Sequence, residues 1–177
     1  MSGGNWGVAR LLTTSLSDRR GWLQFGHLSL PCAIGRSGLR ALKREGDGGT
    51  PIGVFAVREL LYRPDQVRRP HTPHPTRAIR PSDGWCDAAD DRNYNRPVTR
   101  PYRASTEAIW REDHLYDVVG VLDYNIAPRS LGRGSCIFLH VARADFSPTE
   151  GCIALALPDL MQLLEGPMPL MAIDTHH

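Results

Sequence analysis

The chain has 177 residues, of which 41% are hydrophobic, and this length fits one domain that buries about two thirds of the surface its unfolded form exposes. Its formal net charge of +2 gives no general attraction to nucleic acid, and no stretch approaches the roughly eighteen consecutive apolar residues of a membrane-spanning helix. The 14 prolines and 17 glycines disfavour a helical bundle and favour a loop-rich, mainly β protein.

Residues 1–21 are predicted to form an N-terminal extension ahead of the folded domain. Their apolar stretch, residues 8–16, is interrupted by Arg10 and by hydroxyl residues, so an ordinary secretory signal is not visible. At the other end, residues 174–177 are predicted to form a C-terminal tail that has no part in function.

Two predicted strands, residues 22–25 and 27–34, surround Gly26. Residues 53–62 predict a third strand, because the aromatic Phe55 lies there among β-favouring neighbours. We expect these strands to begin an antiparallel sheet.

The segment 63–111 is rich in Pro, Arg, Asp and Asn, shows little periodicity and is longer than a connection in a compact domain should be. It is therefore predicted to be a long loop insertion that is either functional or disordered. The basic region that overlaps it has more arginines than acids; these are Arg58, Arg63, Arg68, Arg69, Arg77 and Arg80. The region has three interpretations: a solvated face, a nucleic-acid surface, or arginine forks for carboxylates. Nucleic acid ranks last, because aromatic residues are not interleaved for stacking.

The last third of the chain again shows regular patterns. It predicts strands over residues 116–124, 135–142, 152–157 and 168–173, and a short helix over residues 158–165 that ends at Gly166.

The most informative pair of residues in this part is His140 and Cys152. Alternation over residues 135–142 places Cys136, Phe138 and His140 on one face of a strand. A thiolate is a strong nucleophile, and a neighbouring imidazole can take the thiol proton. A hairpin-like return of the chain would bring the two side chains together, so Cys152 is the candidate nucleophile and His140 the candidate base. Gly151 has no Cβ, so the Gly151 and Cys152 amides could form an oxyanion hole.

Each residue also has a plainer explanation. A buried cysteine is usually an inert small hydrophobe, and a strand histidine is often a satisfied core residue. Their combination favours catalysis. Cys136 would lie about 13 Å from His140 on the same strand, so it is predicted to be structural.

The four cysteines show no close-set spacing, and at least Cys152 is expected to be free. A zinc site built from Cys86, His71 and His74 is disfavoured, because the chain has no Cys-x-x-Cys pair and these residues lie among prolines.

The sequence Thr149-Glu150-Gly151-Cys152-Ile153 resembles the signature of the L,D-transpeptidases, the YkuD-domain family, in which a histidine precedes a Ser/Thr-His-Gly-Cys-apolar motif. Glu150 stands in place of the second histidine and Ala154 in place of an arginine or asparagine, which indicates a divergent branch. Thr50-Pro51-Ile52-Gly53-Val54-Phe55 is similar to the Thr-Pro-x-Gly-x-Phe element of the family. This element also has a local explanation, as a proline and glycine turn that leads into a strand.

The resemblance implies a β-sandwich or barrel over residues 22–173, with the insertion at 63–111 and few short helices. It implies that Cys152 attacks a peptidoglycan stem peptide, that His140 passes the proton to the leaving D-alanine, and that a thioester forms. An amine from an acceptor stem peptide would then complete a 3-3 or 1-3 crosslink. The implied location is the cell envelope or periplasm, and no metal or organic cofactor is implied. Two alternatives stay open: a hydrolytic L,D-carboxypeptidase or amidase, and a non-catalytic peptidoglycan-binding domain.

The expected substrate-binding residues are Thr149, Arg143, Tyr124, Asn125 and Trp85. Arg143 would replace the missing arginine of the motif by holding a donor carboxylate or by orienting Thr149. Trp85 would either shape the cleft or order the long loop. A carboxylate near a thiolate raises the thiol pKa, so Glu150 is expected to face solvent or to pair with an arginine.

Overall fold

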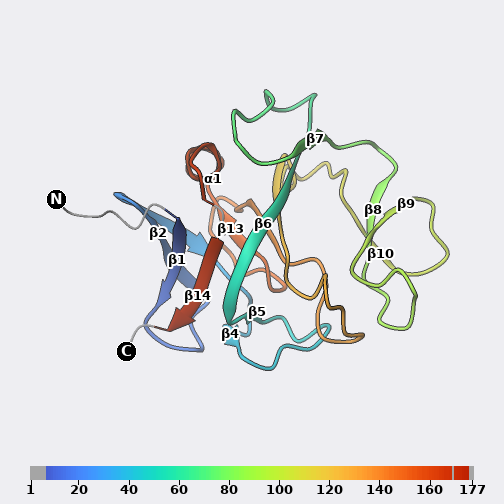
Figure 1. Cartoon of the computed structure of the whole chain (residues 1–177), viewed down its shortest axis with the longest axis horizontal. Helices are drawn as coiled ribbons and strands as arrows, with labels where there is room; N and C mark the ends of the chain where they lie inside the picture. The colour runs from blue at the N-terminus through green and yellow to red at the C-terminus, as the bar shows by residue number, and fades with distance from the viewer. Residues whose placement is uncertain (1–6, 169, 176–177) are drawn as a thin grey trace.

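The computed structural model describes residues 7–168 and 170–175. An 8-strand mixed barrel forms its centre (Figure 1). In order around the barrel the strands are β11 (Val118–Leu122), β12 (Phe138–Val141), β13 (Ile153–Leu155), β3 (Leu28–Ala33), β2 (Arg20–Phe25), β1 (Val8–Thr13), β14 (Leu170–Thr175) and β6 (Gly53–Tyr62). Strand β6 pairs with β11, so the sheet closes on itself and its barrel strands have no free edge. The predicted mainly β barrel fold is confirmed.

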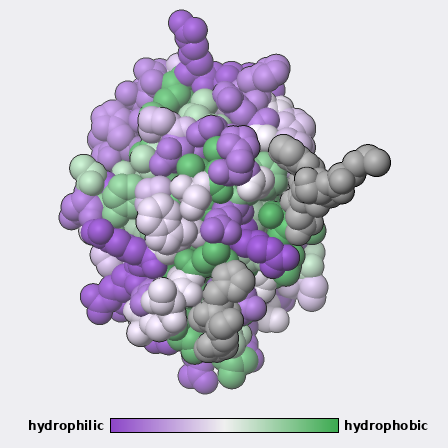
Figure 2. Space-filling model, turned by 90° about the vertical axis from the view of Figure 1, so that its left-hand side faces the viewer, coloured by the Kyte–Doolittle hydropathy of each residue, from purple (hydrophilic) through white to green (hydrophobic). Residues whose placement is uncertain are grey.

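The strands predicted before the insertion are confirmed with small shifts at their ends. Strand β2 buries Gly21, Leu23 and Phe25 and exposes the residues between them, which is the two-residue period of a half-buried strand. Strand β6 has the predicted bounds. On the outer barrel face seen in Figure 2, green hydrophobic side chains are scattered among purple hydrophilic ones.

Strand β1 differs from the predicted N-terminal extension. It pairs in parallel with β14 and antiparallel with β2, inside the large sheet. Ala9 and Leu11 are buried, whereas Arg10 is exposed. Arg10 interrupts an apolar run without interrupting a strand, because alternate side chains point to opposite faces. Residues 1–6 of the predicted extension and residues 176–177 of the predicted tail lie outside the described residues.

The predicted insertion carries strands of its own. Strand β7 (Thr76–Ala78) pairs in parallel with β6, and β8 (Asp83–Cys86), β9 (Pro97–Thr99) and β10 (Thr106–Ala108) form a separate sheet in the order β10-β8-β9. Several of its arginines have partners within the chain: Arg63 stacks over Trp110 and pairs with Asp65, and Arg77 pairs with Asp83. The segment is thus more ordered than a plain loop. Its strands of three or four residues are too short to show a clear period.

Two hydrophobic clusters hold these parts together. Residues such as Leu23, Leu60 and Ile153 fill the barrel, together with Leu160 and Leu163 of helix α1 (Leu157–Glu165). The second cluster joins the insertion to the outside of β11 and β12 through side chains that include Trp85, Ile109, Tyr116, Phe138 and Cys152. In the described part of the chain, no helix is long and apolar enough to cross a bilayer.

The two short strands that remain, β4 (Leu39–Arg40) and β5 (Thr50–Pro51), pair in parallel and enclose a glycine-rich loop. The isolated bridge between Gly35 and Thr149 lies beside this pair, so residues far apart in the sequence meet there. This meeting point positions the candidate site.

Candidate active site

His140 and Cys152 are placed by two neighbouring barrel strands. His140 lies on β12 and pairs with Ala154 of β13, and Cys152 immediately precedes β13. Residues two apart on a strand share a face, so the Cys152 side chain lies on the side of the sheet that His140 occupies. Both side chains line one cavity of about 300 Å³.

The predicted hairpin-like return is wrong, because β12 and β13 run parallel. The connector first crosses to the far side of β13. There the backbone of Thr149 forms two hydrogen bonds: its carbonyl accepts from the Arg36 amide at 2.8 Å, and its amide donates to the Ile34 carbonyl at 2.9 Å. The chain then enters β13 in the same direction as β12. Parallel strands need such a crossover, and here an irregular loop provides it.

Of the residues predicted for the site, four line the cavity: Cys152, His140, Thr149 and Arg143. The opposite wall comes from the insertion and the segment after it, with Glu107, Arg111 and Tyr116. None of these three residues is assigned to the site from the sequence, because no spacing or period connects them to Cys152.

His140 is almost fully buried and neutral. Burial lowers its pKa to about 4, although the hydrogen bond with the Val141 carbonyl acts in the opposite sense. Its Nδ1 lies 2.8 Å from that carbonyl oxygen, so Nδ1 carries the proton of the neutral ring. Nε2 then has a free lone pair. His140 can therefore accept a proton without first losing one.

The lowered pKa makes stability depend on pH. Above pH 6.5 the ring is neutral in both the folded and the unfolded chain, so the full stability is present. As the pH falls from 6.5 to about 4, only the unfolded chain gains a proton, and folding loses about 3 kcal/mol through this group. We expect urea unfolding at pH 7 and pH 4 to show this extra loss in the wild type but not in His140→Gln. Equal losses in the two proteins would contradict it.

Cys152 is also neutral at rest. Burial raises its pKa to about 12, and its Sγ lies 3.1 Å from the Cys136 carbonyl oxygen, to which it donates. The two reacting groups are thus a thiol and an imidazole, not a preformed ion pair. An attack by this sulfur would require the imidazole to take the thiol proton in the same step, which is general-base catalysis.

Cys136 is not part of the strand as predicted, since β12 begins at Phe138 and Cys136 has a φ of 54°. Its carbonyl contacts the thiol of Cys152, and burial raises the pKa of its own thiol well above the ordinary value. All four cysteines are free in this structure. Among the described residues, no three His, Cys, Asp or Glu side chains gather as metal ligands.

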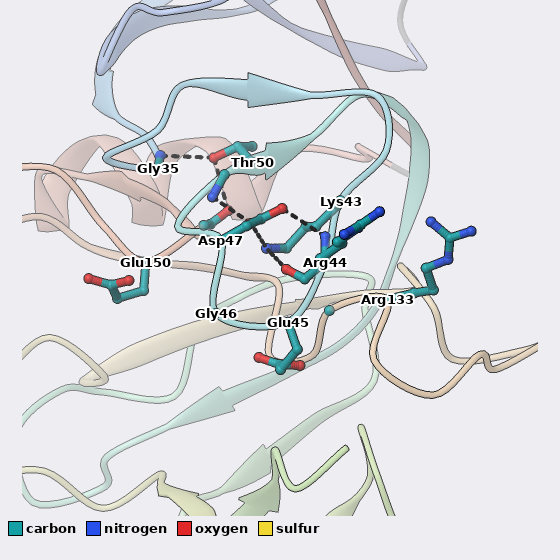
Figure 3. A network of polar contacts seen from close by, with 12 residues as sticks. Gly35, Lys43, Arg44, Glu45, Gly46, Asp47, Thr50, Arg133 and Glu150 are labelled. Atoms are coloured by element: carbon teal, nitrogen blue, oxygen red, sulfur yellow. Dashed lines mark hydrogen bonds and ion pairs between the residues drawn. The ribbon is translucent and has the colours of Figure 1, made fainter. Parts of the chain in front are cut away.

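The backbone before Cys152 is fixed by two threonines. The Thr149 hydroxyl donates to the Cys152 carbonyl at 2.6 Å and accepts from the Gly151 amide at 3.1 Å. The fully buried Thr50 hydroxyl donates to the Gly151 carbonyl and accepts from the Gly35 amide, both at 2.9 Å (Figure 3 labels Gly35 and Thr50). Thr50 therefore does more than begin a turn. One amide of the predicted oxyanion pair, that of Gly151, is engaged by Thr149.

Gly151 is required by its surroundings. Its φ of 136° is one that side chains rarely adopt, and a Cβ there would lie 2.7 Å from the Gly49 carbonyl oxygen. The segment Thr149–Cys152 can therefore pack directly on the glycine-rich loop between β4 and β5.

Glu150 pairs with an arginine, as expected. The Arg36 Nε lies 3.1 Å and 3.0 Å from the two carboxylate oxygens of Glu150, and both side chains are largely exposed. Exposed ion pairs contribute little, typically below about 1 kcal/mol. We expect Glu150→Gln to keep its rate of product formation within about threefold of the wild type. A much larger loss, measured under saturating substrate, would show that the carboxylate takes part in the reaction.

Three residues predicted to bind substrate do not line the cavity. Trp85 is buried and donates to Asn95 Oδ1 at 2.9 Å, which agrees with a loop-ordering role. The Tyr124 hydroxyl donates to the Arg133 carbonyl, and the Asn125 amide donates to the Ser130 and Gly134 carbonyls. These contacts order the loop that leads to β12.

The family model for the L,D-transpeptidase catalytic domain, YkuD, matches residues 9–165. No curated protein and no solved structure matches the chain.

Proposed function

The chain belongs to the YkuD family of L,D-transpeptidase catalytic domains, and from this premise we propose that it crosslinks peptidoglycan stem peptides through a thioester on Cys152. The observation that carries the proposal is that Cys152 and His140 line one cavity, from adjacent parallel strands. The family acts on the cell wall, so we further propose a location in the cell envelope.

In the first half of the reaction, the Cys152 sulfur bonds to the carbonyl carbon of the donor diaminopimelate while Nε2 of His140 takes the thiol proton. The Cys152 amide is the proposed donor to the negative charge that develops on the carbonyl oxygen, since the Gly151 amide already donates to Thr149. When the intermediate collapses, the bond to D-alanine breaks and His140 gives its proton to the leaving amine. The product is a thioester, and no charge is left on His140.

In the second half, an amine of a neighbouring stem peptide attacks the thioester and loses its proton to His140. The carbon–sulfur bond breaks, and the proton returns to Cys152. Water in place of the amine would give a shortened stem peptide and make the same site a carboxypeptidase. The balance between transfer and hydrolysis then depends on how well the cavity, which Tyr116 helps to line, keeps water from the thioester.

Charged side chains around the cavity support a peptide substrate with free carboxylates. The Arg111 guanidinium is occupied by Glu107 and Asp113. Arg143 also lines the cavity, and its charge acts on Asp113 and Asp145, although among the described residues no carboxylate lies close enough to it for a direct ion pair. We propose that Arg143 holds a donor carboxylate, since a guanidinium can bind one with two parallel hydrogen bonds.

The function is tested by mass spectrometry of muropeptides after the protein is incubated with purified disaccharide tetrapeptide. Crosslinked dimers are expected, and their fragmentation identifies the donor bond and separates 3-3 from 1-3 crosslinks. Shortened monomers without dimers would replace the transpeptidase by the hydrolase. An unchanged substrate, with the same result for the tripeptide and pentapeptide donors, would contradict both.

A further inference from the structure

A buried lysine lies directly behind the nucleophile loop. The Lys43 side chain is 3% exposed and runs through a slot between two glycines. A Cβ on Gly134 would lie 2.8 Å from Lys43 Cε, and a Cβ on Gly151 would lie 3.4 Å from Lys43 Nζ. Both glycines have positive φ, of 103° and 136°. The absence of side chains at these two positions thus brings an ammonium group against the residue that precedes Cys152.

Asp47 holds this ammonium in place. Lys43 Nζ donates to Asp47 Oδ1 at 2.8 Å and approaches the Arg44 carbonyl at 3.4 Å (Figure 3). The same carboxylate accepts from the Gly49 amide at 2.8 Å and the Arg44 amide at 2.7 Å. Burial opposes ionisation of Asp47, but the hydrogen bonds from Lys43, Arg44 and Gly49 outweigh it, so the pKa is lowered. The pair is therefore charged.

A charged pair is a costly way to fill a slot, because both ions lose water. A methionine would fill a similar volume without that cost, so stability alone gives no reason for a lysine here. The location of Lys43 gives a reason, because a cation close to a developing thiolate lowers the energy of that thiolate. Arg111, a half-buried cation that lines the same cavity as Cys152, is already paired with two acids.

We propose that Lys43 is a positioning residue for Cys152, whose ammonium, held by Asp47 against Gly151, stabilises the charge that forms on sulfur when His140 takes the proton. The inference rests on the proposed role of Cys152 as nucleophile. It adds a side chain of the β4–β5 loop to the machinery of the site.

Other charged or titratable groups face the same thiol, and the test has to separate Lys43 from them. Those that line the cavity or contact the sulfur are His140, Tyr116, Glu107, Arg111, Arg143, Glu150 and Cys136. Glu107 opposes and Lys43 favours the thiolate of Cys152, whose pKa is raised mainly by burial. Changes confined to Lys43 and Asp47 leave all of these groups in place.

The test measures the rate of Cys152 alkylation by iodoacetamide from pH 6 to pH 10, with mass spectrometry of the Cys152 peptide. In the double variant Lys43→Met/Asp47→Asn, which leaves no unpaired buried charge, we expect the rate at pH 9 to fall about tenfold and the profile to move to higher pH. In Asp47→Asn alone the ammonium is no longer offset, so the rate should rise. The control Arg44→Met removes an exposed charge from the same loop and should leave the profile unchanged.

If Lys43 had a purely structural role, the alkylation rate would change in the same direction in Asp47→Asn and in the double variant. That result would overturn the proposal. The proposal would also be overturned if the double variant unfolded as cooperatively as the wild type and its pH profile of alkylation were unshifted. If the double variant does not fold, Asp47→Asn decides alone, and a rate that does not rise would refute the proposal. Alkylation needs no stem peptide, so this outcome is independent of whether the protein forms crosslinks.

Discussion

Cys152→Ala should reduce turnover of disaccharide tetrapeptide by roughly 10⁴-fold or more, because no other group can form the thioester. The side chain is 8% exposed and Cys152 is followed by a buried strand, so loss of one sulfur atom should leave the fold and the cavity walls in place. The measurement is the initial rate of dimer formation, together with equilibrium binding of the stem peptide. Binding should persist while turnover is lost.

Cys136→Ala is the matched control for this variant. Cys136 lies beside the same cluster, and its backbone carbonyl, not its sulfur, contacts the Cys152 thiol. The Cys136→Ala variant should therefore keep most of its activity. A Cys152→Ala protein within about tenfold of the wild-type rate would exclude a covalent role, because loss of a true nucleophile costs far more.

The second large effect is expected at Thr50. Valine has nearly the same shape as threonine but no hydroxyl, so Thr50→Val should leave the Gly35 amide and the Gly151 carbonyl unpaired in a buried place. Each unpaired buried group costs about 1–3 kcal/mol, so we expect a loss of about 2–5 kcal/mol in the free energy of unfolding. A shift of Gly151 would also misplace Cys152, and a displacement of this kind can cost about 10²-fold in rate.

Thr50→Ser retains the hydroxyl and loses only a methyl group, so it should recover most of both losses. Urea unfolding and the rate of dimer formation measure the two effects separately. If Thr50→Val were as stable and as active as Thr50→Ser, the bridge from Thr50 to Gly151 would have no importance for the site.

Local patterns were enough to predict most barrel strands and to single out His140 and Cys152, which the structure brings to one cavity. Strand β6 follows from its β-favouring residues, and the shared face of Phe138 and His140 follows from the two-residue period of side chains along a strand. The sequence indicated that Gly151 leaves room for a bound carbonyl and an oxyanion hole, whereas the space beside its Cα is taken by the Gly49 carbonyl of the chain itself.

Strand direction and long-range partners were not predictable in this way. The same alternation fits a parallel or an antiparallel β13, and the choice depends on the contact of Thr149 with residues that follow β3. Strand β1 was missed because Arg10 hides its apolar face from a simple hydropathy reading. The cavity wall with Glu107 and Arg111 comes from a segment whose strands are too short to show a period.

The neutral state of His140 and Cys152 also could not be predicted from the sequence, because it depends on how deeply the fold buries them. A sequence indicates that a histidine and a cysteine can react, but burial determines whether they form an ion pair. Here burial lowers the pKa of His140 and raises that of Cys152, so both groups are uncharged before substrate binds.

The most direct test of the account is intact-protein mass spectrometry after brief incubation with disaccharide tetrapeptide and no added acceptor. We expect a covalent adduct equal to the donor without its terminal D-alanine, located on the peptide that contains Cys152 and absent from Cys152→Ala. An adduct on another residue, or product formed at the wild-type rate by Cys152→Ala, would contradict it.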